Sequence, residues 1–254
     1  MNNQACNDID NFVVYYGMGN TDVLTSFDLA VVEPKGHKLE DIFKLKESGT
    51  FVIAYISIVE IHPNDFDYKL FEEHLLVING KTVTNPAFGT VYTDLTYNGR
   101  LDFLYQKAKE YLTEGIYDGL FLDTVGDLEN PKIPVNCMYK QIIGLTEFMK
   151  RIKDEFPDTF IIQNNGLEKL LTYTKEYING ICWENPDFEN NKVKSFNKII
   201  INKLNNLKNQ FGLQIFLLTE ECRTEKKVKK IADKNGFTYY NAPKDYIEIN
   251  RINF

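Results

Sequence analysis

The sequence is poor in the residues that build metal and redox sites. It has three histidines, and neither they nor its four cysteines show the close spacing of a metal-binding motif. The cysteines form no Cys-x-x-Cys pair and lie far apart, at Cys6, Cys137, Cys182 and Cys222. We therefore expect no metal ion and no cofactor, and nothing in the spacing calls for disulfides.

The sequence also lacks long apolar runs and an apolar leader. No run approaches the ~18 residues that a membrane span requires. The first residues, MNNQACNDIDNF, have neither a basic region nor an apolar core. We expect no membrane span, and either a cytoplasmic location or a mature chain whose signal peptide has been removed.

Positive charge is in deficit as well. The formal net charge is −7 and the isoelectric point is about 5.2. This balance argues against nucleic acid as the main partner and is compatible with a neutral or cationic ligand.

What the sequence does have is a set of eight short apolar runs. Most are almost continuously apolar, which is typical of parallel strands that are covered on both faces. The runs cover residues 12–17, 27–34, 50–58, 119–125, 159–165, 177–184, 214–220 and 237–243.

Amphipathic stretches fill most of the gaps between these runs, and several end at a glycine that can cap a helix. Eight alternating units in 254 residues match the length of a (β/α)8 barrel, also called a TIM barrel. An open doubly wound sheet is the alternative. We see no linker, and we expect a single domain over residues 1–254 and a monomer.

One connection breaks this rhythm. Residues 59–100, after the third strand, form a long polar and aromatic excursion. Such an excursion after a barrel strand is expected to lie over the carboxyl ends of the strands and to shape a binding cleft.

Polar side chains follow the apolar runs where each strand is predicted to end. Two are carboxylates that directly follow buried-looking segments, Asp123 after GLFL and Glu184 after GICW. In a barrel the carboxyl ends of the strands converge on one face, which carries the active site. Acidic, amide and aromatic groups on one face suit a sugar. We expect the substrate-binding residues to include Tyr16, Glu33, Tyr55, Glu60, Asn164, Glu220 and Asn241.

Two carboxyl groups on one substrate are the machinery of most glycoside hydrolases. Asp123 and Glu184 lie two strands apart, and neighbouring strands are ~4.8 Å apart, so both can reach one glycosidic bond. We prefer Asp123 as nucleophile and Glu184 as acid/base, although the reverse assignment and an inverting mechanism stay open. The alternatives are a barrel that binds a saccharide without turnover and, more weakly, a divalent-metal hydrolase.

The motifs FVVYYG, FVIAYISIVE, YDGLFLDTV, FIIQNNG and GICWEN also carry a family resemblance. In order and approximate spacing, over residues 12–185, they resemble glycoside hydrolase family 114, the endo-α-1,4-polygalactosaminidases. The resemblance implies a TIM barrel, Asp123 and Glu184 as the catalytic pair, and a galactosamine-containing polymer as substrate. It also matches Glu33, Glu60 and Asn164 to polar residues of the family, and it suggests an extracellular protein.

The chain departs from the family pattern after the third strand. Val59 stands where the family has a glycine, and IHPND replaces an acidic and arginine-containing segment. Both changes lie at the expected wall of the cleft, so they bear on the substrate rather than on the fold.

Overall fold

A computed structural model describes residues 9–250 of the chain. Its centre is a sheet of eight parallel strands, in the order β1-β2-β3-β9-β10-β11-β12-β13. The strands are β1 (Phe12–Tyr15), β2 (Leu29–Val32), β3 (Phe51–Ser57), β9 (Gly119–Asp123), β10 (Phe160–Asn164), β11 (Gly180–Glu184), β12 (Gln214–Glu220) and β13 (Thr238–Ala242). Each of the eight predicted runs contains one of these strands.

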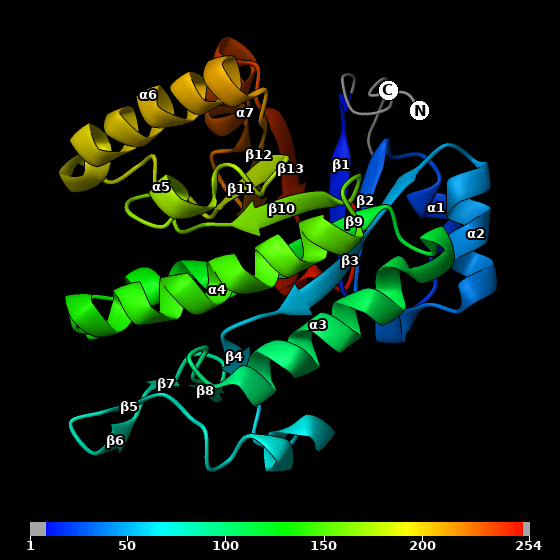
Figure 1. Ribbon diagram of the computed structural model, residues 1–254. Helices are drawn as coiled ribbons and strands as arrows, with labels where there is room; N and C mark the ends of the chain where they lie inside the picture. The colour runs from blue at the N-terminus through cyan, green and yellow to red at the C-terminus, as the bar shows by residue number, and fades with distance from the viewer. Residues whose placement is uncertain (1–8, 251–254) are drawn as a thin grey trace.

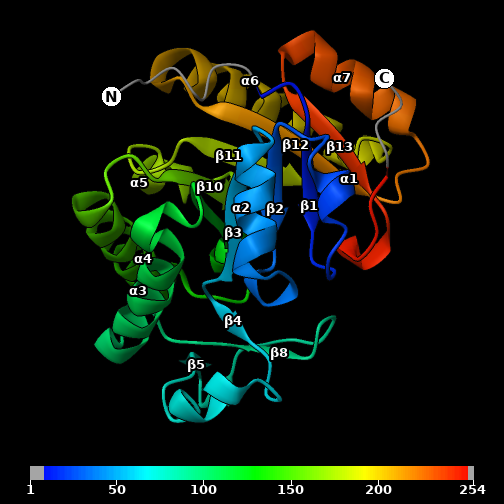
Figure 2. The same ribbon diagram turned by 90° about the vertical axis from the view of Figure 1, so that its right-hand side faces the viewer.

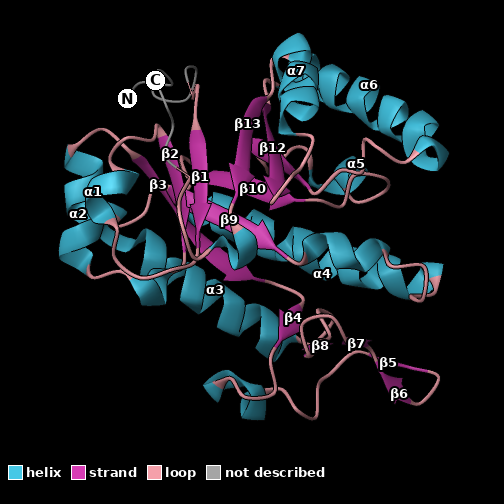
Figure 3. Cartoon of the chain, turned by 180° about the vertical axis from the view of Figure 1, so that it is seen from behind, coloured by secondary structure: helices cyan, strands magenta, loops and turns pink. Residues whose placement is uncertain are grey.

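The sheet curls into a nearly closed barrel, with helices on its outside (Figures 1 and 3). The last strand, β13, lies beside the first. At this seam the carbonyl of Ile9 accepts hydrogen bonds from the side-chain amide of Gln214 and from the Thr238 hydroxyl. The predicted TIM-barrel architecture is therefore confirmed.

Burial explains why the strands read as continuous apolar runs. Every residue of β1, β2 and β10 is buried. One face of each strand packs inside the barrel and the other packs beneath the helices. Because both faces are buried, the strand sequence cannot alternate between apolar and polar residues. Because all eight strands are parallel, their carboxyl ends lie at the same end of the barrel.

The outer helices follow the predicted amphipathic stretches. They are α1 (Thr21–Leu24), α2 (Leu39–Glu47), α3 (Asn98–Leu112), α4 (Val135–Glu155), α5 (Leu171–Thr174), α6 (Lys194–Phe211) and α7 (Glu225–Asn235). Gly212 and Gly236 end α6 and α7 with φ angles of 67° and 61°, the left-handed caps that glycine adopts without strain. Within residues 9–250, no helix has the length and apolar character to cross a membrane.

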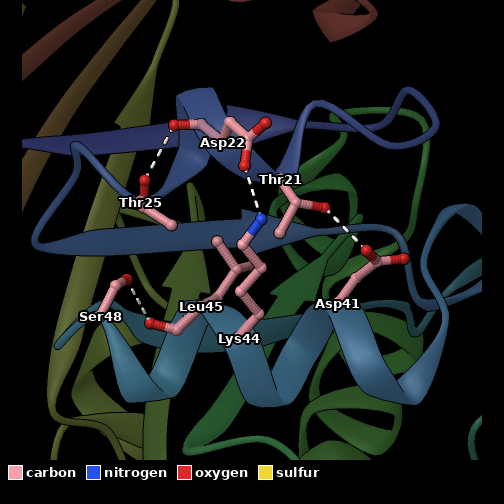
Figure 4. Close-up of polar contacts among 7 residues, drawn as sticks. All are labelled: Thr21, Asp22, Thr25, Asp41, Lys44, Leu45 and Ser48. Carbon is pink, nitrogen blue, oxygen red and sulfur yellow. Dashed lines mark hydrogen bonds and ion pairs between the residues drawn. The ribbon is translucent and has the colours of Figure 1, made fainter.

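Polar contacts join the two helices that follow the first strands (Figure 4). Lys44 on α2 pairs with Asp22 on α1 at 2.6 Å, and the Thr21 hydroxyl donates to Asp41 at 3.0 Å. The ion pair is exposed and contributes little stability. The fully buried Leu45 anchors α2 to the core instead.

The segment between β3 and α3 forms two small antiparallel sheets below the barrel (Figures 1 and 2). Their strands are β4 (Glu60–Ile61), β5 (Val77–Ile78), β6 (Lys81–Thr82), β7 (Thr84–Asn85) and β8 (Thr90–Tyr92). The Val59 amide donates to the Thr124 hydroxyl at 2.9 Å, and the Thr93 amide donates to the Val59 carbonyl at 2.8 Å. These bonds hold the segment at the carboxyl end of β9. Its role in shaping a cleft stays a prediction.

Candidate active site

The two predicted carboxyl groups are joined by one amide. Asp123, Asn164 and Glu184 are the last residues of the neighbouring strands β9, β10 and β11. The buried Asn164 side chain donates from Nδ2 to Asp123 Oδ1 at 2.8 Å and to Glu184 Oε2 at 2.6 Å. Because both hydrogen bonds leave the same nitrogen, these two oxygens can be no farther apart than the two bond lengths together, roughly 5.4 Å.

Two tyrosines complete the hydrogen bonding of this pair. The Tyr55 hydroxyl donates to Asp123 Oδ2 at 2.8 Å, and the Tyr246 hydroxyl donates to Glu184 Oε1 at 2.5 Å. The Tyr16 ring lies between them, with its centroid 4.7 Å from that of Tyr55 and 5.3 Å from that of Tyr246. Each of the four carboxyl oxygens therefore accepts a bond from a neutral donor.

The surroundings of Glu184 favour its protonated form. Burial raises the pKa of Glu184, and the nearby charge of Asp123 raises it further. The hydrogen bonds from Tyr246 and Asn164 act in the opposite direction and lower this pKa. The pKa of Tyr55 is also raised, chiefly by burial, so its hydroxyl stays a donor at neutral pH.

A second pair of carboxyl groups lies beside the first. Glu60 is buried and accepts hydrogen bonds from Asn85 Nδ2 at 2.9 Å and from the Thr90 hydroxyl at 2.5 Å. The pKa of Asp127 is raised to about 8, mainly by burial and next by the charge of Glu60. Asp127 therefore holds a proton at neutral pH. The sequence places Asp127 after the fourth strand, but nothing in its pattern distinguishes it from a loop aspartate.

Tyr246 is the main site residue that the sequence analysis missed. It lies in the 3-10 turn η6 (Lys244–Tyr246), where Asp245 and Tyr246 have φ angles of 58° and 57°. Glu220 Oε1 accepts from the Asp245 amide at 2.6 Å, and the Tyr16 amide donates to the Tyr246 carbonyl at 2.8 Å. Glu220 thus supports the turn that carries Tyr246. The only signal in the sequence is an aromatic residue shortly after the last strand.

Two predicted substrate-binding residues are engaged in hydrogen bonds that support the backbone or a neighbouring strand. Glu33 accepts from the Lys35 amide at 3.2 Å and caps η1 (Pro34–Gly36). Asn241 Oδ1 accepts from the Thr219 hydroxyl at 2.8 Å and from the Cys222 amide at 2.9 Å. Sugar binding by these two residues stays a prediction, as it does for Tyr16, Tyr55, Glu60, Asn164 and Glu220.

The acidic residues are not grouped as metal ligands. Over residues 9–250, no group of three or more His, Cys, Asp or Glu side chains could hold a metal ion.

The family model of glycoside-hydrolase family GH114 matches residues 7–206. The chain belongs to this family. Membership bears out the resemblance in the strand motifs and makes the protein a glycosidase, whose substrate is a saccharide.

Solved structures share the fold of this GH114 member. The glycoside hydrolase domain of PelA from Pseudomonas aeruginosa has a TM-score of 0.79 at 18% identity, over 94% of this chain and 96% of that one. Aspergillus fumigatus Ega3 in complex with galactosamine has a TM-score of 0.65 at 12% identity, over 95% and 92%. The α-galactosidase TtGalA from Thermus thermophilus, in complex with stachyose, has a TM-score of 0.64 at 11% identity, over 95% and 63%. None of the curated protein sequences compared with this GH114 chain matches it.

Proposed function

We propose that this protein is an endo-acting glycosidase that cleaves galactosamine-containing polysaccharide with retention of configuration. Asp123 is the nucleophile and Glu184 is the acid/base. The observation that carries the proposal is the Asn164 amide, which donates to both carboxyl groups at once.

The separation of the two carboxyl groups supports retention. Retaining glycosidases hold their carboxyl groups about 5–5.5 Å apart, whereas inverting enzymes need about 6.5–9.5 Å to admit a water molecule. The shared nitrogen keeps Asp123 Oδ1 and Glu184 Oε2 within roughly 5.4 Å of each other, which is below the inverting range and suits direct attack by one carboxylate.

The raised pKa of Glu184 supports its role as the acid. In the first step an Asp123 oxygen bonds to the anomeric carbon, the glycosidic bond breaks, and the Glu184 proton moves to the leaving oxygen. In the second step Glu184 takes a proton from a water molecule, the water oxygen bonds to the anomeric carbon, and the bond between that carbon and the Asp123 oxygen breaks. The sugar leaves with its original configuration, and both carboxyl groups return to their starting states.

The charge of the protein supports an amino sugar as substrate. An unacetylated galactosamine carries a positive charge, and the site places the carboxylates of Asp123 and Glu60 within one region of a chain of net charge −7. The Ega3 structure, which shares this fold, contains galactosamine.

The excursion after β3 supplies one wall of the cleft in this proposal. Glu60 lies near Asp127, so the segment meets the site at the carboxyl end of the barrel. It also presents two exposed aromatic rings, Phe66 and Phe88, at 93% and 74% exposure. Such rings suit stacking against a sugar. We treat residues 1–254 as one catalytic domain that acts as a monomer.

Replacement of each carboxyl by its amide tests the mechanism. Asp123→Asn and Glu184→Gln keep the shape of the side chain and remove the ionisable group. On partly deacetylated galactosaminoglycan we expect both variants to release reducing ends at least about 100-fold more slowly than wild type. Proton NMR of the first product formed by wild type should show the α-anomer.

An activated substrate separates the two roles. Glu184→Gln should keep most of its glycosylation rate on a galactosaminide with a dinitrophenyl leaving group, which needs no protonation, whereas Asp123→Asn should lose activity on both substrates. Full activity of both variants on the polymer would refute the mechanism. A wild-type protein that binds the polymer without cleaving it would identify a saccharide-binding barrel instead.

A further inference from the structure

A groove of about 410 Å³ opens beside the carboxyl pair, between the loops that follow β9 and β10 and the start of α6. We call it the Trp183 groove. Its volume falls in the range of small-molecule pockets. The residues that matter for its chemistry are Asp127, Glu129, Asn165, Glu168, Trp183 and Phe196.

The Trp183 groove adjoins the active site. Asp127 forms part of its wall and also lies close enough to Asp123 and Glu184 for their charges to raise its pKa. Asn165, another wall residue, accepts a hydrogen bond from the Glu184 amide at 3.0 Å. A polymer that passes over Glu184 can therefore continue into the groove.

The groove offers an aromatic surface. Phe196, near the start of α6, is 40% exposed, whereas Trp183 is only 4% exposed. Phe188 packs edge-on against Trp183, with ring centroids 5.3 Å apart, and holds the indole in place. Phe196 is thus the ring that an incoming sugar can cover.

The groove is also acidic. Glu168 is exposed, whereas the Glu129 carboxylate accepts hydrogen bonds from the amides of Glu168, Lys169 and Leu170. Lys203 contacts the carbonyls of Leu167 and Glu168. Among the residues that line the groove, all within the described part of the chain, none is lysine or arginine. The carboxylates of Glu129 and Glu168 suit a ligand with a positive charge.

We propose that the Trp183 groove is a binding subsite for a further amino-sugar unit of the polymer, beyond the units at the scissile bond. This inference rests on the proposed function. The apolar face of the sugar covers Phe196, and its ammonium group faces Glu168. Occupation of the groove requires an oligosaccharide longer than the pair of units that is cleaved.

The chain contains one tryptophan, so its fluorescence reports on this groove. The inactive Asp123→Asn variant is titrated with a galactosamine disaccharide and with an octasaccharide, and the tryptophan emission is recorded. We expect the octasaccharide to shift the Trp183 emission, and the disaccharide to leave it unchanged.

Phe196→Ala in the Asp123→Asn background supplies the second measurement. Loss of the ring should raise the Kd for the octasaccharide by roughly two- to tenfold, which corresponds to the free energy of one aromatic contact. The Kd for the disaccharide should not change. Ile199→Ala is the matched control, because Ile199 lies on the same helix, is 64% exposed and does not line the groove. It should change neither Kd.

Equal weakening of both ligands by Phe196→Ala, or no weakening, would overturn the subsite. In that case cleavage by the wild-type protein would still support the proposed function. If wild type cleaves no amino-sugar polymer and neither oligomer binds, the proposed function and the subsite fail together.

Discussion

At the scale of single residues, the site depends on neutral hydrogen-bond donors. Asn164, Tyr55 and Tyr246 contact the carboxyl pair without adding a positive charge. A lysine or arginine at these positions would favour the ionised form of both carboxyl groups. Neutral donors orient the oxygens and leave Glu184 able to hold the proton that the mechanism needs.

Tyr246→Phe should shift the pH profile of the enzyme. The Tyr246 hydroxyl stabilises the ionised form of Glu184, so its removal raises the pKa of Glu184 further. The acid must be protonated for the first step, and activity is lost as the pH rises through this pKa. We expect the alkaline limb of kcat/KM to move to higher pH, and kcat to fall about tenfold because Glu184 is less well oriented.

Tyr239→Phe is the control for this prediction. The Tyr239 hydroxyl lies 2.8 Å from the Thr219 hydroxyl, on the strand next to the turn that carries Tyr246. Loss of the Tyr239 hydroxyl should leave the pH profile of kcat/KM unchanged. An unchanged alkaline limb in Tyr246→Phe would show that Tyr246 only supports the fold.

Asp127 should make the protein less stable as the pH rises. Its pKa is about 8 in the folded protein and about 3.9 in an unfolded chain. Between these values the folded state keeps a proton that the unfolded state releases, so the free energy of unfolding falls as the pH increases and then levels off. Below both pKa values Asp127 is protonated in both states, and its contribution to the free energy of unfolding is fully present.

Asp127→Asn removes this dependence of stability on pH, because the amide does not titrate and has an N–H donor at every pH. Thermal unfolding at pH 5, 7 and 9 should give a smaller fall in Tm for the variant than for wild type. The variant should be the more stable protein at pH 9. Parallel Tm curves for the two proteins would contradict the assignment of a raised pKa to Asp127.

At the scale of elements, close backbone contacts fix the loops and helices around the site. A Cβ atom on Gly126 would lie 2.7 Å from Asn165 Cβ and 2.9 Å from the Gly166 nitrogen. The loop after β9, which carries Asp127, therefore packs directly on the loop after β10. This contact keeps the inner wall of the Trp183 groove next to the carboxyl pair.

Gly144 on α4 allows a similar approach to the end of the excursion. A Cβ atom there would lie 2.1 Å from the Leu95 carbonyl oxygen. Gln141, one turn earlier, accepts from the Leu95 amide at 2.7 Å and fixes the same contact. Gly144→Ala should therefore destabilise the protein by about 1–3 kcal/mol, although alanine favours a helix over glycine by about 1 kcal/mol.

Urea unfolding measures this change directly. Ile143→Ala, at an exposed position on the same helix, should alter stability by less than about 0.5 kcal/mol. A Gly144→Ala variant that is more stable than wild type would mean that α4 and Leu95 do not pack this closely.

At the scale of the whole molecule, net charge should govern how strongly the enzyme attracts its substrate. The chain carries a net charge of −7, and a deacetylated galactosamine polymer is a polycation. Raising the salt concentration from about 20 mM to about 300 mM shortens the Debye length severalfold. KM for the deacetylated polymer should rise several-fold over this range, while kcat stays nearly constant.

A fully acetylated polymer of the same length is the comparison, because it has no charge to screen. Its KM, or its Kd if it is not cleaved, should be insensitive to salt. Equal salt dependence for the two polymers would remove the electrostatic argument for an amino sugar and leave the retaining chemistry untouched.

The amino-acid sequence was enough to predict the eight parallel strands, the helices and the three residues at the ends of β9, β10 and β11, and it favoured a barrel over an open doubly wound sheet. Continuous apolar runs specify parallel strands covered on both faces, and parallel strands must bring Asp123, Asn164 and Glu184 to one end. These features depend on local pattern and on the one direction that all the strands share.

The contacts between residues far apart in the sequence became known from the three-dimensional structure. Tyr246 reaches Glu184 across 62 positions of sequence, and Asp127 meets Glu60 from a different loop. The spacing of the carboxyl groups depends on barrel curvature and on the Asn164 rotamer, neither of which a strand pattern encodes. Side-chain burial then set which carboxyl groups hold a proton, because desolvation acts on the packed site and not on the chain.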